Sequence, residues 1–138
     1  MNLAFLLTPV ADVVWLPVAA TVREAIDSLR AWRYTAVPIL DSEGRYSGTV
    51  TAADLLFHLV EVGQQGTLAN LQRRREHVAV SIDTDVRAVL AVAADQNFVP
   101  VIDSRGVLMG IVTRRAILQH VERRWTEDVL LPEGASKR

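Results

Sequence analysis

The stretch VPILDSEGRYSGTVTAADLL at residues 37–56 returns as VPVIDSRGVLMGIVTRRAIL at residues 99–118, an offset of 62 positions (Pro38 to Pro100). Nine of the twenty aligned positions are identical without a gap, where ordinary residue frequencies give about one or two by chance. In each copy an apolar run ends at Asp, a short turn contains Gly, and a second apolar run ends at Thr. The chain is therefore predicted to contain two copies of one supersecondary unit.

The residues around the first copy complete its unit. Residues 13–16 form a short apolar run suited to a strand, and Thr21 and Glu24 have the spacing of a capping box. A helix with one buried face is expected next, because apolar residues follow at helical spacing: Val22, Ala25, Ile26 and Leu29. Residues 36–40 and 46–50 are predicted strands joined by a turn at 41–44, and Thr51 is predicted to cap a second helix.

The second copy has the same order of elements. Strands are predicted at 78–82, 98–102 and 107–112, with a turn at 103–106. Asp83 or Thr84 is predicted to cap its first helix, and its last helix is predicted from residue 114 towards residue 124. The spacing from Val86 to Pro100 is two positions shorter than from Val22 to Pro38, so the helix-to-strand joint near residues 95–97 is expected to be tighter.

The composition indicates a single domain with a sizeable core, since half of the 138 residues are hydrophobic. A net charge of −1 gives no electrostatic reason to expect nucleic acid or an anionic membrane as a partner. The absence of cysteine excludes disulfides and thiol catalysis and is compatible with the cytoplasmic location that we expect. Residues 1–20 are apolar but lack a basic start, and prolines and Asp12 interrupt them short of a membrane span.

The duplicated order of elements resembles the CBS domain, named after cystathionine β-synthase. The resemblance covers about residues 5–124 and is carried by LTP at 7–9, ATVREA at 20–25, VPILD at 37–41, GTVTAAD at 48–54, VPVID at 99–103 and GIVT at 110–113. It implies an α/β fold, more strictly α+β: two CBS repeats, each strand–helix–strand–strand–helix, packed as a pseudo-twofold module. We expect repeat 1 at 1–62, a polar connector with some helix at 63–76, repeat 2 at 77–125 and a C-terminal tail at 126–138.

In that family, clefts between the repeats commonly bind adenosine-containing ligands such as AMP, ADP, ATP or S-adenosylmethionine. The family's Gly-x-x-Thr-x-x-Asp motif matches Gly48, Thr51 and Asp54. The resemblance implies that this cleft is also lined by Ala79, Val80, Ser81, Phe98, Val99 and Pro100. In the second copy Ala116 replaces the Asp, so the other cleft is expected to be degenerate. Its expected lining is Trp15, Leu16, Tyr34, Ala36 and Val37, with Arg114 and Arg115 as candidate phosphate contacts.

Two functional hypotheses remain open at this stage. The first is a stand-alone regulatory module that senses an adenosine-type ligand through Thr51 and Asp54 and acts on a separate effector protein. The alternative is a ligand-free dimerisation or protein-interaction module, because a capping box alone explains Thr51 and Asp54. Either is expected to be a homodimer, with Trp32, Phe57 and Trp125 as candidate contacts.

Catalysis, a required cofactor and a metal site are not expected. His58, His77 and His120 lack metal-ligand spacing, and nothing in the sequence pairs a nucleophile with a base. The run from Arg73 to Arg75 is expected to be a solvated part of the connector.

Overall fold

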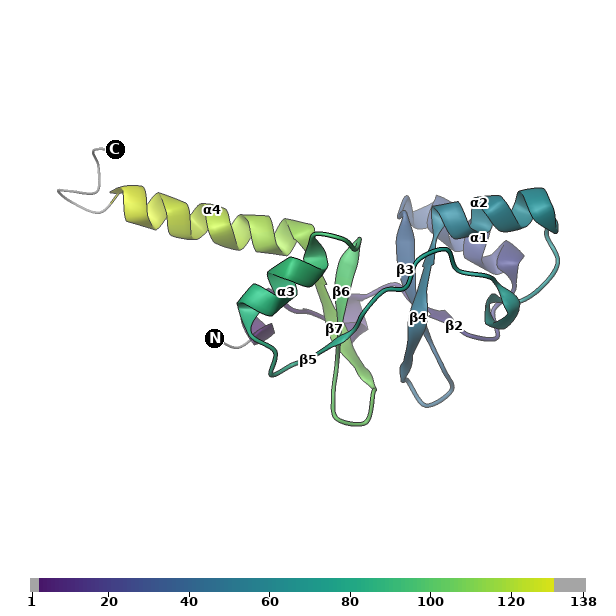
Figure 1. The fold of residues 1–138 in the computed structure, drawn as a ribbon, viewed down its shortest axis with the longest axis horizontal. Coiled ribbons are helices and arrows are strands. Elements are labelled where there is room, and N and C mark those ends of the chain that lie inside the picture. The colour runs from purple at the N-terminus through teal and green to yellow at the C-terminus, as the bar shows by residue number, and fades with distance from the viewer. Residues whose placement is uncertain (1–2, 131–138) are drawn as a thin grey trace.

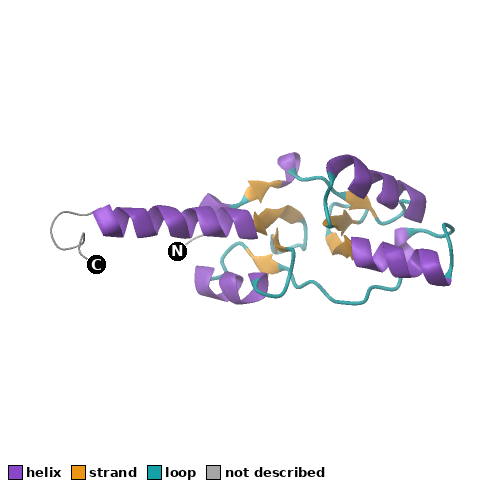
Figure 2. Cartoon of the chain, turned by 90° about the horizontal axis from the view of Figure 1, so that it is seen from above, coloured by secondary structure: helices purple, strands orange, loops and turns teal. Residues whose placement is uncertain are grey.

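The computed structural model describes residues 3–130 and shows two α+β halves side by side. In Figures 1 and 2 the two sheets face each other at the centre, and the helices lie on the outside. The elements in chain order are η1 (Leu3–Leu6), β1 (Thr8–Pro9), η2 (Val10–Asp12), β2 (Leu16–Pro17), α1 (Val22–Trp32), β3 (Ala36–Leu40), β4 (Tyr46–Thr51), α2 (Ala52–Glu61), η3 (Leu68–Asn70), β5 (Val80–Ser81), α3 (Val86–Ala93), β6 (Phe98–Ile102), β7 (Leu108–Thr113) and α4 (Arg114–Leu130).

The first half is a three-stranded sheet, β2-β3-β4, covered by α1 and α2. β2 pairs with β3 in parallel and β3 pairs with β4 antiparallel. Thr21 closes the predicted capping box with Glu24, and the predicted helical face is buried at Val22, Ala25 and Leu29. These side chains pack on the sheet through Val37, Ile39 and Val50.

The second half borrows a strand from the start of the chain. Its sheet has the order β1-β7-β6-β5, and β1 pairs antiparallel with β7. The N-terminal arm (residues 3–12) also places Leu3 and Leu6 in the second half's core, where they are 0% and 5% exposed. The arm lies so close to Gly110 that a Cβ atom there would be 2.1 Å from the Thr8 carbonyl oxygen.

The connector completes the core of the first half in return. Leu68 of η3 is 0% exposed and Leu71 is 7% exposed, and both pack with Val22 and Leu55. The Leu68 N–H donates to the Ala20 carbonyl at 2.9 Å. The prediction of a polar connector is therefore wrong at these two leucines, although the domain boundaries themselves stay predictions.

Contacts between the halves reproduce the 62-residue offset of the repeat. The Tyr46 N–H donates to Gly106 O at 2.9 Å, and the Leu108 N–H donates to Gly44 O at 3.0 Å. Equivalent residues also meet each other: Arg45 forms an isolated bridge with Val107, and the Asn97 amide donates to the Thr35 hydroxyl 62 positions away. A residue can contact its own equivalent only near a local twofold axis, so these pairs place the pseudo-dyad between the two hairpins.

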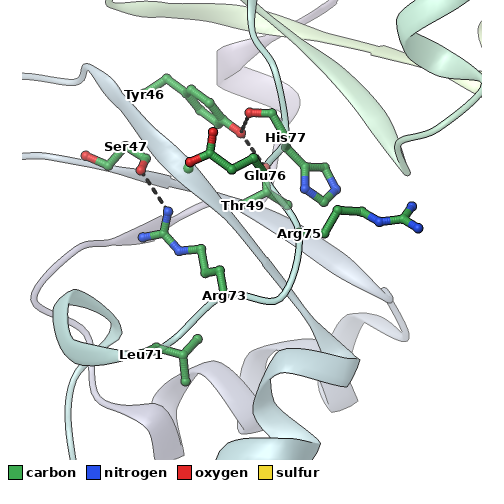
Figure 3. A pocket seen from close by; sticks show the side chains of 9 residues that line it. Tyr46, Ser47, Thr49, Leu71, Arg73, Arg75, Glu76 and His77 are labelled. Atoms are coloured by element: carbon green, nitrogen blue, oxygen red, sulfur yellow. Dashed lines mark hydrogen bonds between the residues drawn. The ribbon is translucent and has the colours of Figure 1, made fainter.

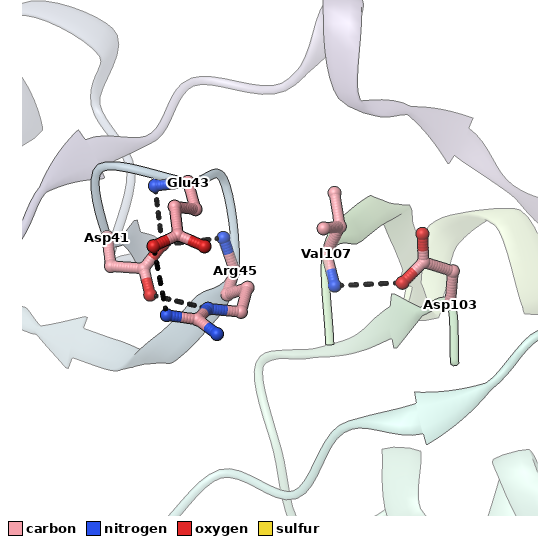
Figure 4. A network of polar contacts seen from close by, with 5 residues as sticks. All are labelled: Asp41, Glu43, Arg45, Asp103 and Val107. Atoms are coloured by element: carbon pink, nitrogen blue, oxygen red, sulfur yellow. Dashed lines mark hydrogen bonds and ion pairs between the residues drawn. The ribbon is translucent and has the colours of Figure 1, made fainter. Parts of the chain in front are cut away.

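The two hairpin turns that meet at this axis are held by aspartates (Figure 4). Asp41 Oδ1 accepts from the N–H groups of Glu43 and Arg45, both at 2.9 Å. Asp103 Oδ1 accepts from the Val107 N–H at 3.0 Å in the same way. Backbone donation, from Arg45 first, holds the pKa of Asp41 below its ordinary value. The identical Asp and Gly of the repeat are thus explained by turn structure.

Several element ends differ from the prediction. The opening strands are short, since β2 and β5 have two residues each. Asp85, and not Asp83 or Thr84, is the N-cap of α3. The helix α4 runs to Leu130, five residues into the expected tail. The rest of that tail and the side chain of Trp125 lie outside the described residues.

Candidate functional site

The carboxylate of Asp54 is buried, with 2% of the residue exposed, and both of its oxygens accept hydrogen bonds from the chain. Thr51 is the N-cap of α2, and its hydroxyl accepts from the Asp54 N–H at 3.1 Å. Asp54 Oδ2 accepts from the Thr51 N–H at 3.0 Å, and Oδ1 accepts from the Arg74 N–H at 2.9 Å. The capping-box interpretation of these two residues is therefore realised, and the connector takes the remaining oxygen.

Residues 71–77, here called the strap, lead from the connector into the second repeat and run alongside β4 (Figure 3). Arg73 donates to the Ser47 carbonyl at 3.0 Å, and Arg75 donates to the Asp95 carbonyl at 2.9 Å. The Arg74 guanidinium lies 3.8 Å from the centre of the Phe57 ring. Arg74 and Arg75 are exposed, as expected for a solvated run, and Arg73 and Arg75 also tie the strap to the two halves of the module.

A cavity of about 410 Å³ remains between the strap and β4. The Tyr46 hydroxyl lies 2.6 Å from Thr49 Oγ1 inside it, and burial raises the pKa of Tyr46 to about 12. All of the lining residues come from these two segments: Tyr46, Ser47, Gly48, Thr49, Leu71, Arg73, Arg75, Glu76 and His77. None of the second-repeat residues predicted to share a cleft with Asp54 lines this cavity.

Most of those predicted partners serve the core of the second half. Val99 is fully buried there, Val80 packs against it, and Pro100 is buried in β6. The Ser81 hydroxyl accepts from the Asp83 N–H at 3.1 Å. Ala79 is half-buried just before β5. Phe98 alone lines a described cleft, and that cleft is on the other side of the pseudo-dyad.

The cleft on that other side, here called the open cleft, has a volume of about 480 Å³, within the range of about 300–1,000 Å³ of small-molecule sites. It is the one that the sequence predicted to be degenerate. Both halves and the N-terminal arm line it: Thr8, Asp12, Val13, Val14, Tyr34, Thr35, Ala36, Pro38, Asn97, Phe98, Ile111, Thr113 and Arg114.

The polar groups of the open cleft are less occupied than their counterparts at Asp54. The Ala52 N–H at the start of α2 donates to Thr35 O at 2.8 Å, but the equivalent Arg114 N–H forms no hydrogen bond to residues 3–130. The Thr113 hydroxyl accepts only from the Ala116 N–H, at 3.0 Å. Arg114 Nε donates to Ala93 O at 3.0 Å, while the residue stays exposed.

The Val14 backbone is also free in this cleft. Its N–H and C=O take part in no hydrogen bond within the described part of the chain. The neighbouring strand cannot supply a donor at Pro38, because proline has no N–H. On the Asp54 side of the pseudo-dyad, the equivalent residue is Val78. Its N–H and C=O are both hydrogen-bonded to the side-chain amide of Gln96.

The sequence placed some of the open cleft correctly. Tyr34 and Ala36 line it as expected, whereas Val37 is buried in the core. Trp15 and Leu16 do not line it, and Val13 and Val14 stand there instead. Arg115 is exposed on α4 and is not part of the lining.

Sequence reasoning missed Asp12 and Val14 for different reasons. The opening strands of the two repeats are offset by 64 positions, because Leu16 pairs with Ile39 and Val80 with Val101. The sequence already indicated this offset, because the spacing from Val86 to Pro100 is two positions shorter than that from Val22 to Pro38. Asp12 had no signal of its own, since η2 follows a strand that joins the opposite half.

Two further properties of the described residues bear on function. They contain no group of three or more histidine, cysteine or acidic side chains that could hold a metal ion. None of their helices is both long enough and apolar enough to cross a bilayer.

Comparisons with known proteins agree with this architecture. A CBS domain protein from Streptococcus pneumoniae TIGR4 is 28% identical, with a TM-score of 0.77 over 86% of this chain and 85% of that one. The CbpB protein of Listeria monocytogenes, solved in complex with c-di-AMP, is 20% identical, with a TM-score of 0.78 over 88% of this chain and 95% of that one.

A curated relative shares only a segment with this chain. The magnesium transporter MgtE of Thermus thermophilus is 33% identical over 93 residues, which are 66% of this chain and 20% of the transporter. The sequence model of the CBS domain matches residues 7–61 and 71–123. The chain therefore belongs to the CBS domain family, as a pair of CBS repeats.

Proposed function

We propose that this CBS pair is a regulatory module that senses an adenosine-containing ligand, and that the ligand binds in the open cleft. The observation that carries this proposal is the difference between the two sides of the pseudo-dyad. The Asp54 side has its carboxylate and the strand backbone occupied by the chain itself. The open cleft keeps free backbone groups, an exposed carboxylate and an exposed cation around one cavity.

The apolar part of the open cleft suits a flat aromatic base. Phe98 and Pro38 lie on facing strands of the two halves, with Ile111 and Tyr34 beside them. The Val14 N–H and C=O offer a donor next to an acceptor, which is the pairing that an adenine edge requires. We place the base between these side chains, with its edge on Val14.

The polar part of the cleft suits a ribose and a phosphate. Asp12 is exposed and lines the cleft, so its carboxylate can accept from both ribose hydroxyls in place of the aspartate that Ala116 replaces. Arg114 and the free N–H at the start of the 17-residue helix α4 can bind a phosphate. The Thr51 and Asp54 assignment stays a prediction that would require the strap to move away.

Titration of the protein with a panel of adenosine-containing compounds would identify the ligand. CbpB, which has the same fold, was solved with c-di-AMP, and this adenosine-containing nucleotide belongs in the panel with AMP, ADP, ATP and S-adenosylmethionine. A ligand present at 100 times its dissociation constant should add about 2.7 kcal/mol to the free energy of unfolding.

The test compares two aspartate variants by calorimetry. Asp12→Asn removes the charge from the open cleft, and we expect it to weaken binding by about 10- to 100-fold, the range of a charged hydrogen bond. Asp83→Asn, which lies at the exposed turn between β5 and α3, is the matched control and should bind as the wild type does. Equal affinity of all three proteins would exclude Asp12 from the site. No binding of any of the five adenosine-containing compounds would contradict the sensing function.

The second candidate function is a ligand-free interaction module. It is favoured by Leu56 on α2 and Leu118 on α4, which occupy equivalent positions of the two repeats and are 57% and 63% exposed. Paired leucines on the outer helices suit a homodimer, as the sequence suggested. A dimer by light scattering, together with no thermal shift for any nucleotide, would favour this candidate over ligand sensing.

A further inference from the structure

We infer that the side chain of Gln96 takes the place of the ligand's base in the cleft on the Asp54 side of the pseudo-dyad, here called the filled cleft. The module would then accept one adenosine ligand per chain and not two. This inference rests on the proposed function of the open cleft. It concerns the opposite side of the pseudo-dyad, where the sequence placed the ligand.

The side-chain amide of Gln96 is hydrogen-bonded to the backbone through both its oxygen and its nitrogen. The residue is 4% exposed, and its Oε1 accepts from the Val78 N–H. Its Nε2 donates to Val78 O at 3.1 Å and to Phe98 O at 3.0 Å. A glutamine amide and an adenine edge both present an acceptor beside a donor, so the amide satisfies the same two backbone groups that a base would need.

The strands leave these backbone groups open by construction. Pro100 lies in β6, the strand next to Val78, and has no N–H that could donate to the Val78 carbonyl. The open cleft has the equivalent arrangement at Pro38 and Val14. There, however, the residue 62 positions before Gln96 is Tyr34, which is 46% exposed and forms no hydrogen bond to the Val14 backbone.

The rest of the filled cleft is occupied in the same manner. The Arg74 N–H takes the Asp54 oxygen that would accept from a ribose hydroxyl. The Arg73 guanidinium lies against Gly48, where a Cβ atom would be 1.8 Å from Nη1. The groups at Val78 and Asp54 that would bind a base and a ribose are thus taken by Gln96 and by the strap, and neither Gln96 nor Asp54 lines the cavity of about 410 Å³ that remains between the strap and β4.

The test counts ligands per chain. Wild type, Gln96→Ala and the double variant Gln96→Ala/Arg73→Ala, which also frees the strap, are titrated by calorimetry with the same five adenosine-containing compounds. Gln119→Ala, an exposed glutamine on α4, is the matched control. Amide hydrogen exchange at Val78 reports independently whether the substitute has been removed, since its N–H then loses its partner.

We expect one ligand per wild-type or Gln119→Ala chain and two per chain in at least one Gln96 variant. One ligand in both Gln96 variants, despite faster exchange at Val78, would overturn the inference and leave the proposed function intact. Two ligands per wild-type chain would do the same. Binding to a Gln96 variant but not to wild type would support Gln96 as the substitute for the base, but it would refute both the open cleft as the site and the count of one ligand per wild-type chain. No binding to any of the proteins would refute both proposals.

Discussion

Leu68→Ala tests the observation that the connector is part of the first half's core. Leu68 is fully buried and packs with residues of α1 and α2. Removing a buried leucine side chain costs about 2–5 kcal/mol, which includes the cavity left behind. At about 3 °C per kcal/mol for a chain of this size, a loss of about 3 kcal/mol lowers the melting temperature by roughly 10 °C.

The assay is thermal and urea unfolding followed by circular dichroism, with Val62→Ala as control. Val62 is also apolar and directly precedes the connector, but it is 60% exposed, so its truncation should change stability by less than about 0.5 kcal/mol. Equal stability of the two variants would show that η3 is not packed in the core. The interpretation of the connector as structure would then fail.

The remaining predictions concern the N-terminal arm and the half-buried phenol of Tyr46. Gly110→Ala should destabilise the protein by about 1–3 kcal/mol, because its Cβ would meet the Thr8 carbonyl; faster proteolysis within the first ten residues would show that β1 has been displaced, and an unchanged arm would refute this. Tyr46 should ionise only near pH 12, because burial raises its pKa above the ordinary value of about 10. Its contribution to stability is therefore complete below about pH 10 and is lost as the pH rises towards 12. An absorbance titration of the wild type against Tyr46→Phe measures the pH at which Tyr46 ionises, and ionisation at the ordinary value would contradict the half-buried position of its hydroxyl.

Local signals predicted the repeated units well. The strands at 36–40 and 98–102, both hairpin turns and the caps at Thr21 and Thr51 follow from short-range patterns. These elements depend on residues within a few positions of each other, through a capping hydroxyl, a turn aspartate or an alternation of apolar side chains. A single sequence contains all of that information.

The occupancy of the two clefts could not be predicted in this way. Whether Asp54 meets a ligand or the Arg74 N–H depends on a connector 20 residues away, and Asp12 reaches the open cleft because β1 joins the opposite sheet. The aspartate of the intact motif is therefore bound by the chain itself, whereas the copy with Ala116 in place of the aspartate borders the open cleft.

The exchange of the N-terminal arm and η3 between the halves has a consequence for how the protein melts. A repeat excised at its own boundaries would lack part of its hydrophobic interior, since Leu3 and Leu6 sit in one half and Leu68 in the other. Detachment of either segment exposes apolar surface in the half against which it packs, so both halves should unfold in one cooperative transition. A nucleotide held on one side of the dyad would then protect the whole chain against heat and proteases.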